Sequence, residues 1–405
     1  MNNLTLDDIQ ALEARHVVTT YKRQPVGFVR GSGCRLYDVD GREYLDLISG
    51  IGVASLGHAH PGLAAAIADQ AATLLHTSNL YYHPLQGQVA ARLTTLSGLA
   101  RAFFANSGTE AVEGCLKFAR RFWFTQGVTT RTNFVALENA FGGRTMGALS
   151  VTWDEHYRTP FQPLLGQVTF VRPGDVAALE AAVNDRTAAI IAEPIQGEGG
   201  IRPLSKEFAQ AIMSVCRRTG TLYIADEVQT GLGRTGYPFY FPVLGLEPDL
   251  VSIGKALGSG VPVGAILMSE RVAKAISPGD HGTTYGGNLL ACRAALFFLE
   301  QLMDHGLLDH VKAVGPLLER RLRALALKHP VIVETRGVGL MQGLQLAVDA
   351  TPIVDGARQR GLLVNRTNER VVRMLPPLTI EAADVDRAVD ILDEVFAAVQ
   401  AEVHV

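Results

Sequence analysis

The 405-residue sequence has only four cysteines, Cys34, Cys115, Cys216 and Cys292, and none of them forms a CxxC pair. This scatter argues against a disulfide framework and a zinc site, and it favours reduced thiols in a cytoplasmic protein. The sequence also lacks a run approaching the ~18–20 apolar residues of a membrane span, and its first residues lack the basic and apolar parts of a signal peptide. We therefore expect neither a membrane span nor a signal peptide.

The sequence has little excess charge of either sign. The 37 lysines and arginines nearly balance the 40 aspartates and glutamates, which gives a formal net charge of −3. This balance points to neither a nucleic-acid partner nor a membrane surface. The length is sufficient for one large α/β unit and a smaller second unit.

Short apolar runs alternate with longer helical patterns through the middle of the chain. The expected strands are residues 101–105, 133–137, 168–171, 188–192, 221–225, 250–253 and 265–268. Several of these runs are almost wholly apolar, which is typical of strands buried on both faces of a mainly parallel sheet. Helical stretches such as 109–125 and 206–219 lie between them. The alternation predicts an α/β fold with a doubly wound large domain.

The two ends of the chain have a different pattern. Residues 26–47 read as a small meander with a turn at Asp40-Gly41, and the chain beyond residue 295 contains long helices, short strands and a final helix near 384–399. We expect these ends to form a smaller α+β domain. The expected division is 1–58 as a segment joining the small domain, 59–292 as the large domain and 293–405 as the C-terminal small domain.

One motif that carries chemistry is the sequence NSGTEA at residues 106–111, which follows an expected strand and opens an expected helix. Ser107 and Thr109 suit a helix N-cap, and Gly108 would allow the backbone to approach an anion closely. A helix N-terminus favours a phosphate through its free N–H groups and its dipole. A simple helix cap remains the alternative for this motif taken alone.

Two further residues carry charge at expected strand ends. Asp226 lies at the carboxyl end of an apolar strand, where α/β sheets bind ligands, and its carboxylate could pair with a cationic ring nitrogen or simply cap a turn. Lys255 follows another apolar strand and precedes a glycine-rich loop. Most lysines are solvated, but one in this setting can have a lowered pKa and act as an amine nucleophile. A phosphate cradle, an acid and a buried lysine are together the parts that hold pyridoxal phosphate.

The chain resembles the class III aminotransferases of the acetylornithine/ornithine type, which have fold type I. The resemblance extends from about Tyr21 to Leu378 and rests on the motifs NSGTEAVEGCLKFAR, FGGRTMGALS, AEPIQGEGG, DEVQTGLGRTG, SIGKALGSGVPVGA, HGTTYGGN and RMLPPL. It implies a large domain with a mainly parallel sheet, a smaller α+β domain and the cofactor pyridoxal 5'-phosphate. No metal is implied: the histidines in the GHAHP sequence, His58 and His60, lack further ligands at a suitable spacing and read as a structural loop.

The resemblance also implies the residues that hold the cofactor. Lys255 is expected to form the imine, and Asp226 to pair with the pyridine nitrogen. The remaining expected contacts are Gly108 and Thr109 to the phosphate, Phe141 and Val228 to the two ring faces, Gln229 to the ring hydroxyl and Thr284 to the phosphate of a neighbouring subunit. The contact from Thr284 implies a homodimer.

The substrate residues are implied in the same way. Arg373 is expected to bind the α-carboxylate of 2-oxoglutarate or glutamate, and Arg144 the distal carboxylate. Glu198 is expected to pair with Arg373 and to swing away when 2-oxoglutarate binds. Thr283 and Tyr21 are further expected substrate contacts. The family often has FHGRT where this chain has FGGRT, and Gly142 is expected to enlarge the pocket by removing a side chain.

The reaction implied is the conversion of N2-acetylornithine and 2-oxoglutarate to N-acetylglutamate 5-semialdehyde and glutamate, a step of arginine biosynthesis. The alternative is another ω-aminotransferase that acts on ornithine, 4-aminobutyrate, succinylornithine or a carrier-bound lysine precursor. The sequence motifs do not separate these substrates. A non-enzymatic phosphate-binding protein is a remaining alternative, and it would show no visible cofactor absorbance.

Overall fold

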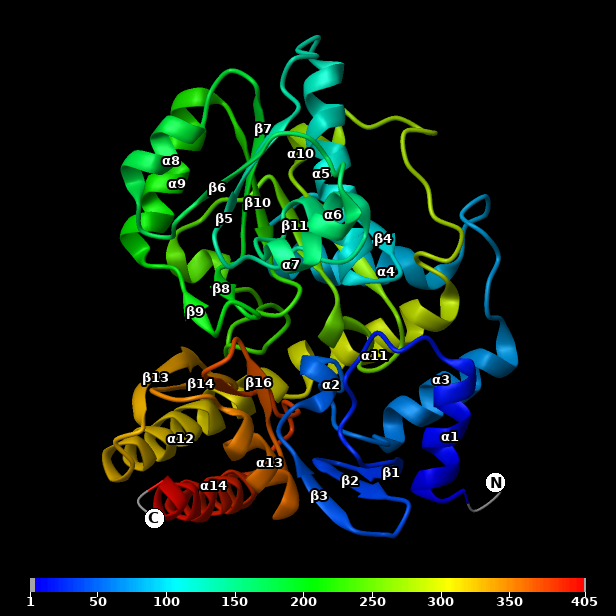
Figure 1. The fold of residues 1–405 in the computed structure, drawn as a ribbon. Coiled ribbons are helices and arrows are strands. Elements are labelled where there is room, and N and C mark those ends of the chain that lie inside the picture. The colour runs from blue at the N-terminus through cyan, green and yellow to red at the C-terminus, as the bar shows by residue number, and fades with distance from the viewer. Residues whose placement is uncertain (1–3, 404–405) are drawn as a thin grey trace.

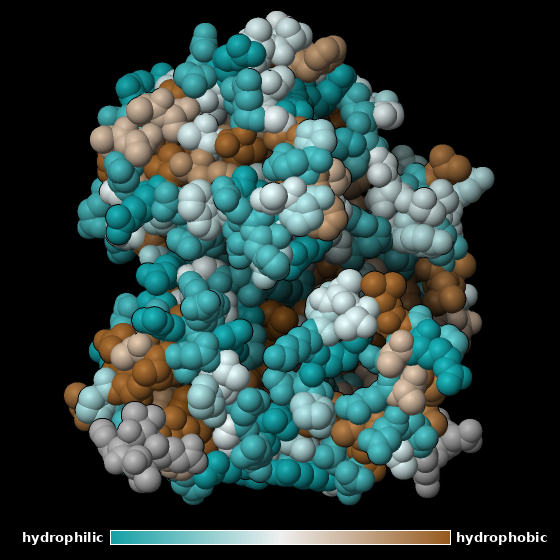
Figure 2. Space-filling view, in the orientation of Figure 1, coloured by the Kyte–Doolittle hydropathy of each residue, from teal (hydrophilic) through white to brown (hydrophobic). Residues whose placement is uncertain are grey.

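A computed structural model describes residues 4–403 of the chain; the outermost residues of the expected first and last segments, 1–3 and 404–405, lie outside it. Figure 1 shows two lobes, with the middle of the sequence in one lobe and both ends of the chain in the other. Figure 2 shows that hydrophilic residues cover most of this face and that the surface is hollowed between the lobes. Among the described residues, no helix combines the length and the apolar character needed to cross a membrane.

The large lobe is built on a seven-stranded sheet within residues 4–403, with the order β4-β12-β11-β10-β7-β5-β6. Its strands are β4 (Arg101–Ala105), β5 (Asn133–Leu137), β6 (Val168–Val171), β7 (Thr187–Ala192), β10 (Leu222–Asp226), β11 (Leu250–Ile253) and β12 (Gly264–Met268). All neighbours pair in parallel except β12, which is antiparallel to both β11 and β4. The seven strands expected from the sequence are therefore confirmed, and the sheet is mainly parallel.

Helices cover both faces of this sheet. The helices between residues 61 and 273 are α3 (Pro61–Thr73), α4 (Pro84–Ser97), α5 (Gly108–Thr125), α6 (Met146–Ser150), α7 (Glu155–Arg158), α8 (Val176–Ala182), α9 (Lys206–Thr219) and α10 (Glu270–Ala273), with short 3-10 turns η1 (Thr159–Phe161), η2 (Phe241–Leu244) and η3 (Lys255–Gly258). In β10, Leu222 and Ile224 pack in the same core as α5, whereas Tyr223 and Ala225 pack in the core that contains α9. Because side chains alternate along a strand, α5 and α9 lie on opposite faces.

The small lobe joins the two ends of the chain. One of its sheets contains β1 (Phe28–Ser32), β2 (Arg35–Asp38), β3 (Glu43–Asp46) and β15 (Leu362–Leu363), and the other contains β13 (Ile332–Val338), β14 (Met341–Leu346), β17 (Val371–Met374) and β16 (Asn365–Thr367). Its helices are α1 (Leu6–His16), α2 (Ser49–Gly52), α12 (Leu307–Lys328), α13 (Thr351–Gln359) and α14 (Ala382–Val403). Leu45 on β3 pairs in parallel with Leu362 on β15, so the N-terminal segment is part of this lobe.

Helix α11 (Leu289–Asp304) connects the lobes. It packs against α3 and α4 of the large lobe and against α12 of the small lobe. The expected domain boundary between residues 292 and 293 falls within this continuous helix. The division at residues 58 and 292 therefore stays a prediction about domains, although the sheets themselves separate clearly.

A short hairpin projects from the large lobe toward the small one. Its strands are β8 (Ile195–Gln196) and β9 (Arg202–Pro203), and the loop between them contains the glycines of the QGEGG sequence. The small-lobe strand β13 contacts β9. The hairpin therefore places the loop of residues 197–201 between the two lobes, which is where the candidate site lies.

Candidate active site

The site begins at the carboxyl ends of β10 and β11, where Asp226 and Ser252 are register partners. The Ser252 hydroxyl donates to Oδ1 of Asp226 at 3.0 Å, and the Val228 backbone N–H donates to the same oxygen at 3.1 Å. The Asp226 residue is only 6% exposed. Its carboxylate is therefore fixed in a buried position at the edge where a parallel sheet binds ligands.

Lys255 comes directly after Gly254 at the end of β11 and has a left-handed φ of 41°. A non-glycine residue in this region is strained, which indicates that the surroundings hold the backbone there. Burial is the main cause that lowers the pKa of Lys255. The charge of Arg373 also lowers it, whereas the carboxylates of Glu198 and Asp226 raise it. A lysine with a lowered pKa has more of its amine in the neutral, nucleophilic form near neutral pH.

Asp226 responds to burial in the opposite direction. Burial raises the pKa of the Asp226 carboxyl, while the hydrogen bonds from Val228 and Ser252 lower it. A buried carboxylate in this setting gains stability from a cationic partner. The position therefore suits the protonated ring nitrogen of the cofactor that the sequence predicts.

The first turn of α5 forms the expected phosphate cradle. The Ser107 side chain caps the helix by accepting from the Glu110 N–H at 3.3 Å. A Cβ atom built on Gly108 would lie 2.6 Å from Val228 Cγ1, and one built on Gly254 would lie 3.1 Å from the Gly108 backbone. Glycine is thus required at residue 108 for three segments to meet. The arrangement combines an open helix N-terminus, Val228 and the lysine loop, which fits an anionic cofactor with a ring.

Thr109 has a second role in addition to its place in the helix. Its Oγ1 accepts from the Arg144 N–H at 2.9 Å and from the Thr145 N–H at 3.1 Å. Both lone pairs are used in this way, and the Thr145 hydroxyl itself donates to Glu113 at 2.6 Å, so the Thr109 hydroxyl donates to the Thr145 hydroxyl at 3.2 Å. The Thr109 hydroxyl would have to turn away from Thr145 to donate to an anion. Through these hydrogen bonds, Thr109 links the first turn of α5 to the loop that carries Phe141.

The expectation for Gly142 is wrong. A Cβ atom built at this position would lie 2.6 Å from both the Ala148 carbonyl oxygen and Val151 Cγ2. The Gly142 N–H also donates to the Thr152 hydroxyl at 3.0 Å. Gly142 therefore packs against α6 and the residues after it, and it leaves no space that would enlarge the pocket.

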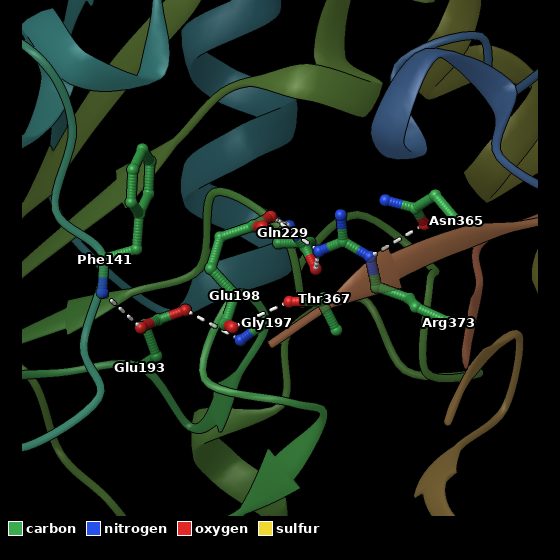
Figure 3. A network of polar contacts seen from close by, with 8 residues as sticks. All are labelled: Phe141, Glu193, Gly197, Glu198, Gln229, Asn365, Thr367 and Arg373. Carbon is green, nitrogen blue, oxygen red and sulfur yellow. Dashed lines mark hydrogen bonds and ion pairs between the residues drawn. The ribbon is translucent and has the colours of Figure 1, made fainter. Parts of the chain in front are cut away.

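Glu193 is a buried acid that the sequence reasoning missed. Its two carboxylate oxygens accept from the backbone N–H groups of Phe141 and Gly197, both at 3.0 Å (Figure 3). Burial and then the nearby charge of Asp226 raise the pKa of Glu193, whereas these hydrogen bonds lower it. Glu193 fixes both the loop of Phe141 and the loop that precedes Glu198. The signal was present, because Glu193 follows the apolar strand β7 just as Asp226 ends β10.

The opposite side of the site is a network around Arg373 on β17 (Figure 3). Its Nη1 donates to Oε1 of Glu198 at 2.5 Å and lies 3.4 Å from Oε1 of Gln229, and its Nε donates to Oδ1 of the cross-strand neighbour Asn365 at 3.2 Å. Gln229 also donates to Glu198 at 3.4 Å. Although burial opposes it, the Arg373 charge lowers the pKa of Glu198. Glu198 is therefore ionised and covers the guanidinium of Arg373.

Sequence reasoning identified Arg373, Glu198 and Gln229 but missed the residues that support them. Asn365 and Thr367 lie on β16, beside the strand that carries Arg373. The Thr367 hydroxyl donates to the Glu198 carbonyl at 2.7 Å. These partners depend on strand register, for which the short segment 365–367 carries no recognisable signal.

The remaining expected substrate and interface residues lie apart from this network. The Arg144 side chain is exposed, with its guanidinium 3.9 Å from the ring of Tyr157 and 5.4 Å from the ring of Phe141. Thr284 is exposed, Tyr21 is 72% exposed, and the hydroxyl of Thr283 accepts from Asn106 at 3.2 Å. Among residues 4–403, no hydrogen bond or ion pair joins Tyr21 or Thr284 to the network.

The two histidines of the GHAHP sequence have structural contacts. His58 lies 2.7 Å from Asp46, and the ring of His60 accepts from the first turn of α3. Arg234, in the GLGRTG sequence, is 1% exposed and donates to the carbonyls of Leu340 and Pro376, which connects the two lobes. In the part of the chain that is described, no group of three or more potential ligands could hold a metal ion.

Comparison with known proteins places this site in a family. The family model of the class-III aminotransferases matches residues 18–396. An acetylornithine aminotransferase from Methanocaldococcus jannaschii is 44% identical over 389 residues, covering 96% of this chain and 98% of that protein. One from Archaeoglobus fulgidus is 45% identical over 380 residues, covering 94% and 98%.

Solved structures agree with the sequence comparisons. The ornithine aminotransferase of Toxoplasma gondii ME49 matches with a TM-score of 0.94 at 33% identity, covering 98% of this chain and 96% of that chain. The acetylornithine aminotransferase of Elizabethkingia anophelis matches with a TM-score of 0.86 at 29% identity, covering 98% and 100%. The expected fold, that of a fold type I transferase with a mainly parallel large sheet, is confirmed. The chain belongs to the class-III aminotransferase family.

Proposed function

We propose that the protein is a pyridoxal-phosphate-dependent aminotransferase that converts N2-acetylornithine and 2-oxoglutarate to N-acetylglutamate 5-semialdehyde and glutamate. The observation that carries this proposal is the buried Arg373, whose only anionic hydrogen-bond partner among residues 4–403 is Glu198. An arginine that can exchange its own glutamate for a substrate carboxylate suits an enzyme with two alternating substrates. The acetylornithine aminotransferases that share over 40% identity with this chain support the choice of donor.

The residues of the large lobe supply the parts that the cofactor needs. When bound, pyridoxal phosphate withdraws electrons from the substrate carbon that bears the amine and accepts that amine. Lys255 would attach the cofactor through its amine, and Asp226 would favour the protonated form of the ring nitrogen. Gly108 and Thr109 would bind the phosphate at the start of α5, while Phe141 and Val228 would cover the ring and Gln229 would contact its hydroxyl.

Lys255 then acts as the acid and base. With the cofactor bound, the amine of Lys255 would be the group placed to take a proton from the substrate carbon and to return one, acting as base and then as acid. The lowered pKa of Lys255 favours this role, because it increases the fraction of the amine that is neutral, and the neutral form is the one that accepts a proton. The same residue would move the proton in the reverse direction in the half-reaction with 2-oxoglutarate.

The two arginines bind the carboxylates of the substrates. While the δ-amino donor is bound, Glu198 would stay paired with Arg373, and the donor's α-carboxylate would bind Arg144. Thr283 and Tyr21 are assigned as further contacts to the donor. When 2-oxoglutarate enters, Glu198 swings away and the α-carboxylate of 2-oxoglutarate takes its place on Arg373. Arginine suits both positions, because its planar group forms two parallel hydrogen bonds to a carboxylate.

A homodimer with shared sites is part of this proposal. Leu80, Tyr82 and Tyr285 are 83%, 106% and 63% exposed, which is unusual for side chains of this size. Asn79 donates to the carbonyls of Thr283 and Gly286 and thereby joins the two exposed segments into one surface. Thr284 lies on this surface, from which it would reach the phosphate bound to the partner. Light scattering of the purified protein tests the dimer directly.

A cytoplasmic location is also proposed. The four cysteines of the chain are all buried and unpaired. Burial raises the pKa of the Cys34, Cys216 and Cys292 thiols to about 12, so these side chains behave as small apolar groups. Unpaired thiols are typical of proteins that remain in a reducing compartment. Fractionation of the source cells with an antibody against the protein tests this location.

The half-reaction tests the choice of donor. The cofactor-loaded enzyme is mixed with N2-acetylornithine, ornithine, 4-aminobutyrate or N-succinylornithine, and the loss of the cofactor's visible absorbance is recorded. We expect acetylornithine to react fastest. Faster reaction with another amine would show that the donor is wrong while the chemistry at Lys255 stands. No reaction with any of the four would point to a carrier-bound donor.

A further inference from the structure

The loop that carries Glu198 is held from the small lobe. The Thr367 hydroxyl on β16 donates to the Glu198 carbonyl at 2.7 Å, and Nε of Arg336 on β13 donates to the Gly200 carbonyl at 2.6 Å. Thr367 is 3% exposed, so water does not compete readily for this hydrogen bond. In Figure 3, Thr367 lies beside Glu198, on the same side as Arg373 and Asn365.

The large lobe confines the same loop from the other side. The Gly197 N–H donates to Glu193 at 3.0 Å. A Cβ atom would lie 2.3 Å from Gln229 Oε1 if built on Gly197, and 2.6 Å from the Asn139 carbonyl if built on Gly199. The backbone of residues 197–200 is thus packed between the lobes with no room for further side chains. Glu198 is the one residue of this stretch that has a side chain able to move.

We propose that Thr367 is a positioning residue for substrate exchange, because its hydroxyl fixes the backbone of Glu198 so that the side chain alone opens and closes over Arg373. This inference rests on the proposed exchange of substrates at Arg373. Thr367 does not touch the substrate and acts only through Glu198. Arg336 supports the same loop two residues further along, at the Gly200 carbonyl.

The tether favours the closed position of Glu198 over the open one. A charge-assisted contact of 2.5 Å between Glu198 and Arg373 requires the Cα atom of Glu198 at one place. A side chain that has swung into the open cleft has no such requirement. Loosening the backbone therefore weakens the closed ion pair and leaves the open state unaffected. Arg373 remains in place in both states, because Asn365 holds its Nε at 3.2 Å.

The test is the change Thr367→Val, which removes the hydroxyl and keeps the shape. Glutarate, an unreactive dicarboxylate, is titrated calorimetrically into the cofactor-loaded enzyme. Because glutarate must displace Glu198 from Arg373, we expect its Kd to fall by about three- to tenfold, the equivalent of one hydrogen bond. The KM for 2-oxoglutarate should fall in parallel, and the KM for the amine donor should rise, since an uncovered Arg373 attracts the wrong carboxylate.

Two matched variants distinguish a specific effect on the position of Glu198 from a general loss of stability of the fold. Thr367→Ser retains the hydroxyl and should bind glutarate as the wild type does. Thr335→Val makes the same substitution on β13, at the opposite edge of the same sheet, and should also leave the Kd unchanged. General loosening of the fold would weaken binding, so tighter binding in Thr367→Val alone supports the proposal. Unchanged or weaker binding in that variant overturns it.

If Thr367→Val does not fold, Arg336→Gln provides a second test of whether release of the loop tightens glutarate binding. This change frees the Gly200 carbonyl on the same loop and should also tighten glutarate binding, whereas unchanged or weaker binding overturns the proposal. A wild-type enzyme that binds no glutarate overturns both this proposal and the exchange at Arg373. A wild-type enzyme that binds glutarate but ignores acetylornithine overturns only the choice of donor, and the comparison of variants then proceeds with the amine that reacts.

Discussion

Arg373 and Arg144 are both expected to bind carboxylates, yet their surroundings are opposite. Arg373 is 1% exposed, lies within a sheet of the small lobe and is paired with Glu198 and Asn365. Arg144 is exposed, and its guanidinium stacks 3.9 Å from the ring of Tyr157. Among the described residues, Arg144 forms no ion pair. Arg373 therefore has a carboxylate partner that a substrate could replace, whereas Arg144 is exposed to solvent and is accessible to a substrate carboxylate directly.

The difference has a physical reason. A buried guanidinium without an anion would be strongly destabilised, so a chain that places Arg373 in its interior must also provide Glu198. An exposed guanidinium is stabilised by water and by the π face of Tyr157, and it needs no carboxylate. The comparison predicts that changes at the buried end of the site alter activity strongly, while changes at the exposed end alter it weakly.

The largest effect is expected from the removal of Lys255, because both substrates react at this residue whichever arginine binds their carboxylate. We expect Lys255→Ala to lower kcat by about a thousandfold or more, because the attachment point and the acid–base group are lost together. The visible absorbance of the attached cofactor should disappear as well. Stopped-flow spectroscopy of the half-reaction provides both measurements.

Lys274→Ala is the matched control for this change, since Lys274 is an exposed lysine at the C-cap of α10 with 74% side-chain exposure. It should retain full activity and the full absorbance. A Lys255→Ala enzyme with normal absorbance and more than a tenth of the wild-type rate would contradict the assignment of Lys255.

A smaller effect is expected at the buried arginine. Arg373→Lys keeps the charge but loses the planar, two-point contact, so the KM for 2-oxoglutarate should rise by about ten- to a hundredfold. The KM for the amine donor should change much less, because Glu198 covers this position while the donor is bound. Steady-state kinetics with each substrate varied in turn measures the two values. An equal rise for both substrates would argue against selective use of Arg373.

The sequence predicts the central framework of this protein well. The strands of the large sheet are short apolar runs with clear ends, and the strand-end positions of Asp226 and Lys255 follow from them. Buried parallel strands leave this signature because both of their faces are covered. Residues that act at the ends of such strands can therefore be found from the sequence alone.

The supporting residues could not be found in this way. Asn365 and Thr367 reach Arg373 and Glu198 only because β16 pairs with β17 in one register, and a strand of three residues carries too little pattern to predict that pairing. The error at Gly142 has a similar origin. The absence of a side chain was interpreted as space, whereas Ala148 and Val151 already occupy that direction.

A third prediction concerns the exposed region that is expected to meet a partner subunit. If Thr284 donates a neutral hydroxyl to the partner's bound phosphate, Thr284→Val should raise the Kd of pyridoxal phosphate by about three- to tenfold. Fluorescence titration of the cofactor-free enzyme measures this value. Thr130→Val, at an exposed threonine in the loop after α5, is the control and should not change it. An unchanged Kd in Thr284→Val would remove the reason to assign Thr284 to the phosphate.

The smallest effect is expected at Arg144, where the same substitution as at Arg373 gives the most direct comparison. An exposed arginine shares its carboxylate contact with water, so Arg144→Lys should raise the KM for the amine donor by less than about fivefold and leave that for 2-oxoglutarate unchanged. A rise of a hundredfold would mean that the assembled enzyme buries Arg144. The difference in burial between Arg144 and Arg373 would then hold only for the single chain. In the dimer, the partner subunit would bury Arg144 as β16 and β17 bury Arg373.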